Sequence, residues 1–146
     1  MSEEFTEEQL AAAKKQLQAE HENTLKDIRQ QLFDVGASDL YESDESINAL
    51  PELLGKNEDI IYASAAFVNN DNTLVVITTK RMIFINAKNT SNVTETTFDK
   101  IQDASFKKKL LFSNVTIHTD TAEILLESVE KKVAPIFVEK LNKLIN

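Results

Sequence analysis

Two histidines, His21 and His118, are the residues best suited to acid–base chemistry or metal binding in this 146-residue chain, which contains no cysteine. Neither has a serine, an aspartate or a second ligand at the spacing of a catalytic triad or a zinc site. The lack of cysteine removes thiolate nucleophiles, thiolate metal sites and disulfides. We therefore expect a non-enzymatic protein without catalytic residue, metal site or cofactor, with His21 at the edge of a helix seam and His118 on a strand surface.

Two clusters of charged residues are further candidates for a binding site. Four acidic residues between positions 39 and 45 lack the glycine and the closing glutamate of a calcium-binding loop, so a flexible connector is the simpler interpretation. The sequence has one run of three basic residues, Lys107, Lys108 and Lys109. Such a run is usually a solvated turn, but three lysines at a loop tip could also contact a phosphate. They are the candidate anion-contact residues.

The formal net charge of −8 is distributed unevenly. Residues 1–50 carry 12 acidic and 4 basic side chains, whereas residues 51–146 carry 12 of each. This asymmetry predicts a boundary near residue 50. It makes nucleic acid an unlikely partner and an anionic membrane an unlikely or weak one, so we expect the protein not to bind anionic vesicles at physiological ionic strength. No run approaches the roughly 18 apolar residues of a membrane span, and the N-terminus lacks the pattern of a signal peptide, so we expect a cytoplasmic protein.

Residues 1–35 predict one long amphipathic helix. Thr6-Glu-Glu-Gln9 has the form of a capping box, and no proline or glycine interrupts the segment from about Glu7 to Phe33. The apolar stripe of this helix is narrow and needs a cover. The cover could be a second copy of the helix, its own domain or another protein, unless the helix is frayed. The candidate interaction residues of this seam are Leu10, Leu17, Leu25, Ile28 and Leu32.

Residues 36–49 have the acidic, small and polar composition of a linker. A short helical stretch, marked by Ile47, Leu50, Leu53 and Leu54 and ended by Gly55, then gives way to alternating apolar residues, which indicates strands. This pattern predicts an α+β domain over residues 50–146 that folds alone: a bent antiparallel sheet of seven strands, closed by an amphipathic C-terminal helix. The strands are expected at 59–68, 73–79, 82–85, 93–98, 101–106, 110–118 and 122–126.

Several short stretches together resemble bacterial pleckstrin-homology (PH) domains of the YokE-like type, which occur in Gram-positive bacteria and their prophages. They are Leu53-Leu54 with Glu58, Leu74-Val-Val-Ile-Thr78, Arg81-Met-Ile-Phe84 and Phe98-Asp-Lys-Ile101. The resemblance runs from about Leu50 to the C-terminus. It implies a PH-like barrel or sandwich of seven strands with a C-terminal helix.

The resemblance also draws attention to Arg81, the hairpin arginine. We expect its guanidinium to tie the hairpin to a carbonyl or a carboxylate, in preference to binding a ligand. Eukaryotic phosphoinositide-binding relatives use basic residues in the first hairpin, but the turn at 69–72 has no cation here. The sequence therefore predicts a protein-interaction or assembly module. The alternative is a weak binder of an anionic membrane or ligand through the lysine run.

Overall fold

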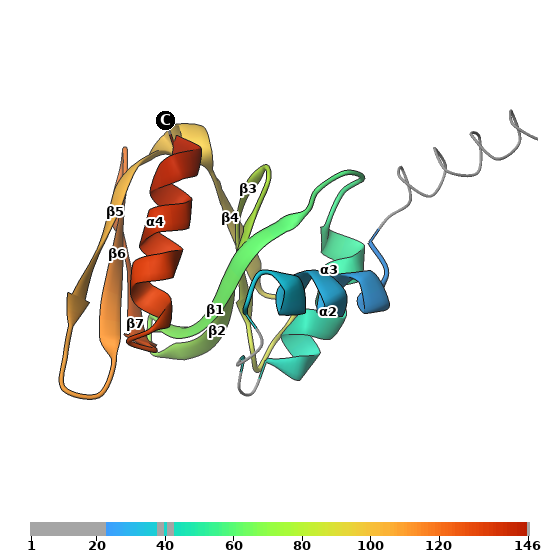
Figure 1. The fold of residues 1–146 in the computed structure, drawn as a ribbon, viewed down its shortest axis with the longest axis horizontal. Helices are drawn as coiled ribbons and strands as arrows, with labels where there is room; N and C mark the ends of the chain where they lie inside the picture. The colour runs from blue at the N-terminus through green and yellow to red at the C-terminus, as the bar shows by residue number, and fades with distance from the viewer. Residues whose placement is uncertain (1–22, 38–39, 41–42, 146) are drawn as a thin grey trace, which may run out of the picture.

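The computed structural model describes residues 23–37, 40 and 43–145, whose arrangement is shown in Figure 1. Two short helices, α2 (Leu25–Asp34) and α3 (Asp44–Leu53), precede the strands, and α4 (Val133–Ile145) follows them. None of these helices is long and apolar enough to cross a membrane. The strands, with the 3-10 turn η1 (Phe98–Lys100) after the fourth, are β1 (Ile60–Val68), β2 (Asp71–Thr78), β3 (Arg81–Asn86), β4 (Val93–Thr97), β5 (Ile101–Lys108), β6 (Ser113–Thr119) and β7 (Glu123–Val129).

The seven strands form an antiparallel sheet in the order β4-β3-β2-β1-β7-β6-β5, which bends where β1 meets β7. Helix α4 lies in the angle between the two halves and contacts β1, β5 and β6 (Figure 1). There Phe137 of α4 meets the ring of Tyr62 edge-on, with the ring centroids 6.4 Å apart. The predicted PH-like α+β fold, with a bent antiparallel sheet and a C-terminal helix, is confirmed. The sheet is not closed, because β4 and β5 are its two ends.

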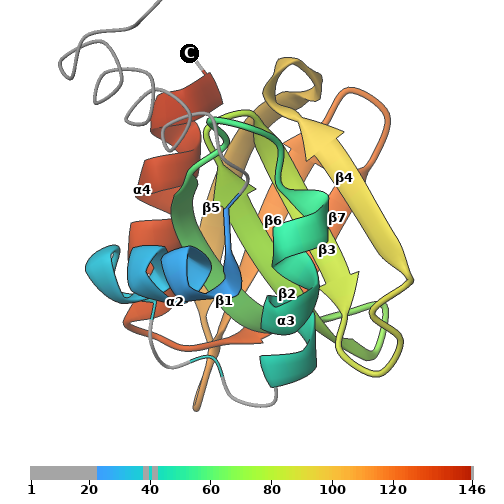
Figure 2. The same cartoon turned by 90° about the vertical axis from the view of Figure 1, so that its right-hand side faces the viewer.

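Strands β2 and β3 are buried on both faces. Every residue from Thr73 to Thr78 and from Met82 to Ile85 is buried, whereas a half-exposed sheet would show alternation. The cause is visible in Figure 2, where α2 and α3 cover the face of the sheet opposite α4. The two helices contribute to the same hydrophobic core as the strands, through Ile28, Leu32, Ile47 and Leu50.

The prediction of one continuous helix from Glu7 to Phe33 is wrong. Thr24 has an extended backbone, and α2 begins after it, at Leu25. The Thr24 hydroxyl accepts a hydrogen bond from the backbone N–H of Asp27, and the Asp27 carboxylate accepts one from the backbone N–H of Thr24. This reciprocal capping box satisfies helix-end donors and fixes where α2 begins. The part of the predicted helix over residues 7–22 lies outside the described residues.

Two further boundaries need correction. The linker predicted over residues 36–49 is wrong from Asp44 onward, because α3 begins there and buries Ser46 and Ile47. The strand predicted over residues 110–118 is wrong at its start, because β6 begins at Ser113. Pairing of Lys108 with Ser113 closes the β5–β6 hairpin and leaves the intervening residues in the turn.

Candidate interaction surface

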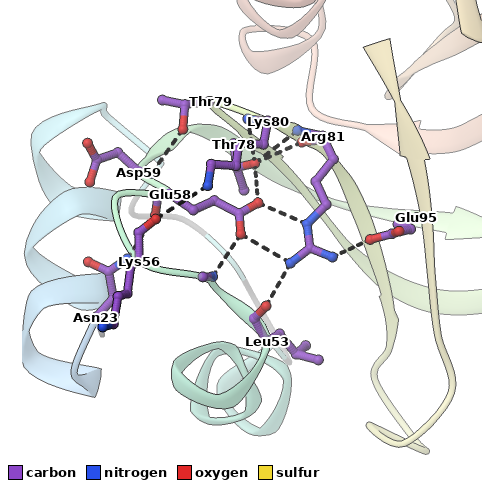
Figure 3. A network of polar contacts seen from close by, with 11 residues as sticks. Asn23, Leu53, Lys56, Glu58, Asp59, Thr78, Thr79, Lys80, Arg81 and Glu95 are labelled. Carbon is purple, nitrogen blue, oxygen red and sulfur yellow. Dashed lines mark hydrogen bonds and ion pairs between the residues drawn. The ribbon is translucent and has the colours of Figure 1, made fainter. Parts of the chain in front are cut away.

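Glu58 and Arg81 form an ion pair where the start of β1 meets the β2–β3 turn (Figure 3). Glu58 is only 1% exposed. Arg81 Nε donates to Glu58 Oε2 at 2.9 Å, and Nη2 donates to Oε1 at 3.1 Å. The same carboxylate accepts hydrogen bonds from the Thr78 hydroxyl at 2.6 Å and from the backbone N–H of Gly55 at 2.9 Å. Four donors thus converge on one buried carboxylate, which compensates for its loss of water.

Arg81 is committed to the fold through further contacts. Its Nη2 also donates to the carbonyl oxygen of Leu53 at 2.7 Å, and its Nη1 pairs with the Glu95 carboxylate. Burial would raise the pKa of Glu58, but the hydrogen bonds from Arg81 and Thr78 outweigh burial and hold that pKa below its usual value. The hydrogen bond to Glu58 raises the pKa of Arg81. The prediction that Arg81 ties its hairpin to a carbonyl and a carboxylate is confirmed.

His118 lies on β6 beside one acidic residue from each neighbouring strand. Its Nε2 is 3.8 Å from Asp103 Oδ1 on β5, and its Nδ1 is 3.2 Å from Glu123 Oε1 on β7. These are cross-strand neighbours, so spacing along the sequence could not reveal them. The predicted strand-surface position of His118 is confirmed. Within the described part of the chain, no group of three or more His, Asp and Glu side chains is placed to hold a metal ion.

Three consecutive apolar residues occupy the tip of the β5–β6 hairpin. Leu110 is 89% exposed, Leu111 76% and Phe112 45%. The turn is closed by a hydrogen bond of 2.8 Å from the backbone N–H of Lys109 to the carbonyl oxygen of Phe112. Figure 1 shows the hairpin projecting beyond the start of α4. Leaving adjacent large apolar side chains in water forgoes the free energy of burial, so these three residues, here called the apolar tip, form a candidate contact surface.

Lysines lie next to the apolar tip. Lys107, Lys108 and Lys109 precede it, and all three are exposed. Lys131, between β7 and α4, donates from Nζ to the carbonyl oxygen of Leu110 at 2.7 Å, and exposed Lys132 follows it in the chain. The structure therefore joins two basic runs that lie more than twenty residues apart in sequence. The predicted anion-contact residues lie next to apolar residues for which the sequence predicts a strand.

A cavity of about 300 Å³ lies beside the hairpin. Phe112 lines it together with small residues of β1, the connection between α2 and α3, and the start of α4. Alanines in the middle of β1 leave this space, because larger β-branched side chains would fill it. Apolar surface thus continues from the tip into the body of the protein, along Phe112, Val133, Ala63, Ala66, Ala37 and Leu40.

The predicted seam of the N-terminal helix is partly covered by the chain itself. Ile28 and Leu32 are buried in the core, and Leu25 packs against it. A hydrogen bond of 2.8 Å from the backbone N–H of Ile60 to Gln31 Oε1 fixes α2 to the start of β1. Of the covers that the sequence left open, the protein's own domain is the one seen for these residues. Leu10 and Leu17 lie outside the described residues, and their role stays a prediction.

A bent seven-stranded antiparallel sheet with a C-terminal helix defines the PH-like class of protein. The chain belongs to the Bacterial PH domain family, whose model matches residues 54–143. The match begins at the residue after α3, so α2 and α3 both lie outside it.

Similarity to individual solved structures supports the fold and nothing beyond it. One solved structure, the crystal structure of the C-terminal domain of an unknown protein from Leishmania infantum, aligns with a TM-score of 0.52 at 14% sequence identity. The alignment covers 64% of this chain and 91% of that one. A search of curated proteins gives no match.

Proposed function

We propose that this bacterial PH domain protein is a non-enzymatic interaction module whose contact surface is the tip of the β5–β6 hairpin. The observation that carries the proposal is the exposure of three successive apolar residues, Leu110, Leu111 and Phe112, on a projecting turn. By contrast, Ile28 and Leu32 of the predicted seam are buried in the core, and Leu25 packs against it. A cytoplasmic location, the YokE-like type and a Gram-positive or prophage origin remain predictions from the sequence.

If the tip is the contact surface, changing it should release the protein from its binding partner in the cell that produces it. The double variant Leu110→Ser with Leu111→Ser removes most of the exposed apolar surface of the tip without touching the core. The matched control is Leu125→Ser on β7, because Leu125 is 44% exposed and is paired with Thr116, well away from the turn. Fractionation of cell lysate by sedimentation and gel filtration compares the wild type with both variants.

We expect the wild type and the control to run with membranes or with an assembly larger than the 16.5 kDa monomer. The tip variant should run as the free monomer. If the wild type is itself a free monomer, or if the tip variant stays in the same fraction as the wild type, the tip is not the contact surface.

A further inference from the structure

We infer that the partner of the hairpin tip is an anionic lipid bilayer, into whose headgroup region Leu110, Leu111 and Phe112 insert. This inference rests on the proposed function, since it names the partner of the same surface. The surface combines exposed apolar side chains at the apex with lysines immediately behind them. Apolar side chains that enter the boundary of the acyl chains, and cations that stay with anionic headgroups, are the two contributions that hold peripheral proteins on membranes.

The kind of cation distinguishes a bilayer from a protein partner. Lysine is depleted at protein–protein interfaces relative to the rest of the surface, while aromatic residues and arginine are enriched. The cations next to the tip are lysines: Lys107, Lys108 and Lys109 precede it, Lys131 contacts the Leu110 carbonyl, and Lys132 follows Lys131 in the chain. Near an anionic leaflet each lysine is worth about fivefold in affinity. Charge complementarity therefore favours anionic lipid.

The distribution of charge also supports an orientation in which the hairpin tip faces the anionic bilayer. No acidic residue occurs from Ala104 to Thr119, a stretch that spans most of the hairpin. The acidic residue next to Lys131 is Glu130, which is half-buried and lines the cavity. The acidic helix α3 lies on the other side of β1 and β2 from the hairpin (Figure 1). At physiological ionic strength, charges separated by more than about 8 Å are largely screened, so α3 offsets the lysines only weakly.

The hydrogen bond from Lys131 to Leu110 lowers the cost of moving the turn out of water into the membrane boundary. A backbone carbonyl that enters the membrane boundary without a donor is costly. The Leu110 carbonyl already has the Lys131 ammonium at 2.7 Å, and the Phe112 carbonyl accepts the N–H of Lys109 at 2.8 Å. The sequence alone, with three lysines counted against a negative chain, makes an anionic membrane an unlikely or weak partner. The structure adds two lysines, the apolar tip and these satisfied carbonyls.

The test uses the full chain with vesicles of phosphatidylcholine alone or mixed in equal parts with phosphatidylglycerol. Because the protein has no tryptophan, Leu111→Trp gives a fluorescence probe without background from other indoles, and Leu125→Trp is the matched probe away from the tip. We expect a blue shift for Leu111→Trp on the anionic vesicles and none for Leu125→Trp. Vesicle sedimentation should show binding that weakens as salt is raised.

Charge-reversal variants distinguish the effect of the lysines next to the tip from the effect of the net charge of the protein. Lys107→Glu, Lys108→Glu and Lys109→Glu together should weaken binding by about a hundredfold or more. The control, Lys56→Glu with Lys100→Glu and Lys143→Glu, changes the net charge equally at exposed sites outside the hairpin turn and should stay within a few-fold of the wild type.

Three results would overturn the inference: no binding to anionic vesicles, equal binding to neutral ones, or equal losses in the two charge-reversed proteins. If the wild type does not bind anionic vesicles, but the Leu110→Ser, Leu111→Ser variant runs as a free monomer where the wild type runs with a cellular assembly, the partner is a protein. The proposed function then holds. If that variant also changes nothing in cells, the proposed function fails as well.

Discussion

The guanidinium of Arg81 meets the carboxylate of Glu58 at two points, with Nε 2.9 Å from one oxygen and Nη2 3.1 Å from the other. Only arginine can make this planar two-point contact, because the lysine ammonium is a single point charge. The pair joins the β2–β3 turn to the start of β1, and the further bond from Arg81 to the Leu53 carbonyl adds the end of α3. One side chain thus holds three elements together.

Replacing Arg81 should destabilise the fold strongly. We expect Arg81→Met to cost about 3 kcal/mol of unfolding free energy, because it leaves the Glu58 carboxylate buried without its cation. Arg81→Lys should cost less, since the charge stays while the two-point contact is lost. Urea unfolding measures both. Lys80→Met is the control at an exposed neighbouring cation, where the change should remain under about 0.5 kcal/mol. A wild-type midpoint for Arg81→Met would show that the pair is dispensable.

Glu58 should also make stability depend on pH. Its pKa is held below the usual value in the folded protein, so the folded state binds its proton less readily than the unfolded chain does. Its contribution is therefore fully present above its ordinary pKa of 4.5 and is lost as the pH falls through the lower folded value. We expect the stability difference between wild type and Glu58→Gln to shrink with acidification over that range.

Other carboxylates titrate in the same range, so Glu52→Gln on the exposed side of α3 serves as the control. Unfolding free energies of the three proteins at matched pH values separate the effects. A gap between wild type and Glu58→Gln that stays constant with pH would show that Glu58 does not titrate differently in the two states.

Helix α2 should be part of the cooperative fold. Ile28 and Leu32 are buried in the core, so Ile28→Ala should cost about 2–5 kcal/mol, as large-to-small changes in cores do. Lys26→Ala on the exposed face is the control. The sequence predicts that residues 50–146 fold alone, whereas burial of α2 and α3 leads us to expect that this fragment loses its cooperative thermal transition. A sharp transition in the fragment would restore the sequence-based boundary.

The strands could be predicted from sequence because their alternation and turn residues are local signals. The turn at Asn69 and Asn70 shows this well: both residues have positive φ, which asparagine tolerates better than most residues. Burial of β2 on both faces could not be predicted in the same way. It depends on helices from a different part of the chain, and the acidic residues around Asp44 gave that part the composition of a linker.

The proposed contact surface can be predicted only in part from the sequence. The sequence indicates the lysine run, but it places Leu110, Leu111 and Phe112 in a strand, because these apolar residues lead directly into an alternating segment. The strand register places these residues in the turn, because Lys108 pairs with Ser113 and the chain must reverse between them. The approach of Lys131 is a contact across twenty-one positions that no local pattern encodes.

Self-association through Leu10 and Leu17 remains to be tested. If these two residues form a seam between copies, the wild type should gain mass with concentration in light scattering, and Leu10→Glu with Leu17→Glu should remain monomeric. The double variant should keep the thermal midpoint of the wild type, whereas the core variant Ile28→Ala should lower the midpoint and keep the concentration dependence. A wild type that is monomeric at every concentration would rule out this role of the seam.

Asn142 of α4 covers the free edge of the sheet at β5. Its side-chain amide donates from Nδ2 to the carbonyl oxygen of Ala104 at 3.0 Å, and its Oδ1 accepts from the Ala104 N–H at 2.9 Å. These two bonds replace those that another strand would make, and a covered edge resists pairing with other chains. The contact also fixes α4 against the strand that leads into the hairpin tip.

Asn142→Ala should therefore cost about 1–3 kcal/mol, because it leaves a part-buried N–H and a carbonyl without partners. Asn142→Asp keeps the acceptor for the Ala104 N–H but loses the donor, so it should retain slow hydrogen exchange at that amide while losing some stability. Lys143→Ala, at the exposed neighbouring position, is the control. Fast exchange at Ala104 in Asn142→Ala alone would establish that this side chain protects the edge. Unchanged exchange would mean that packing of α4 suffices.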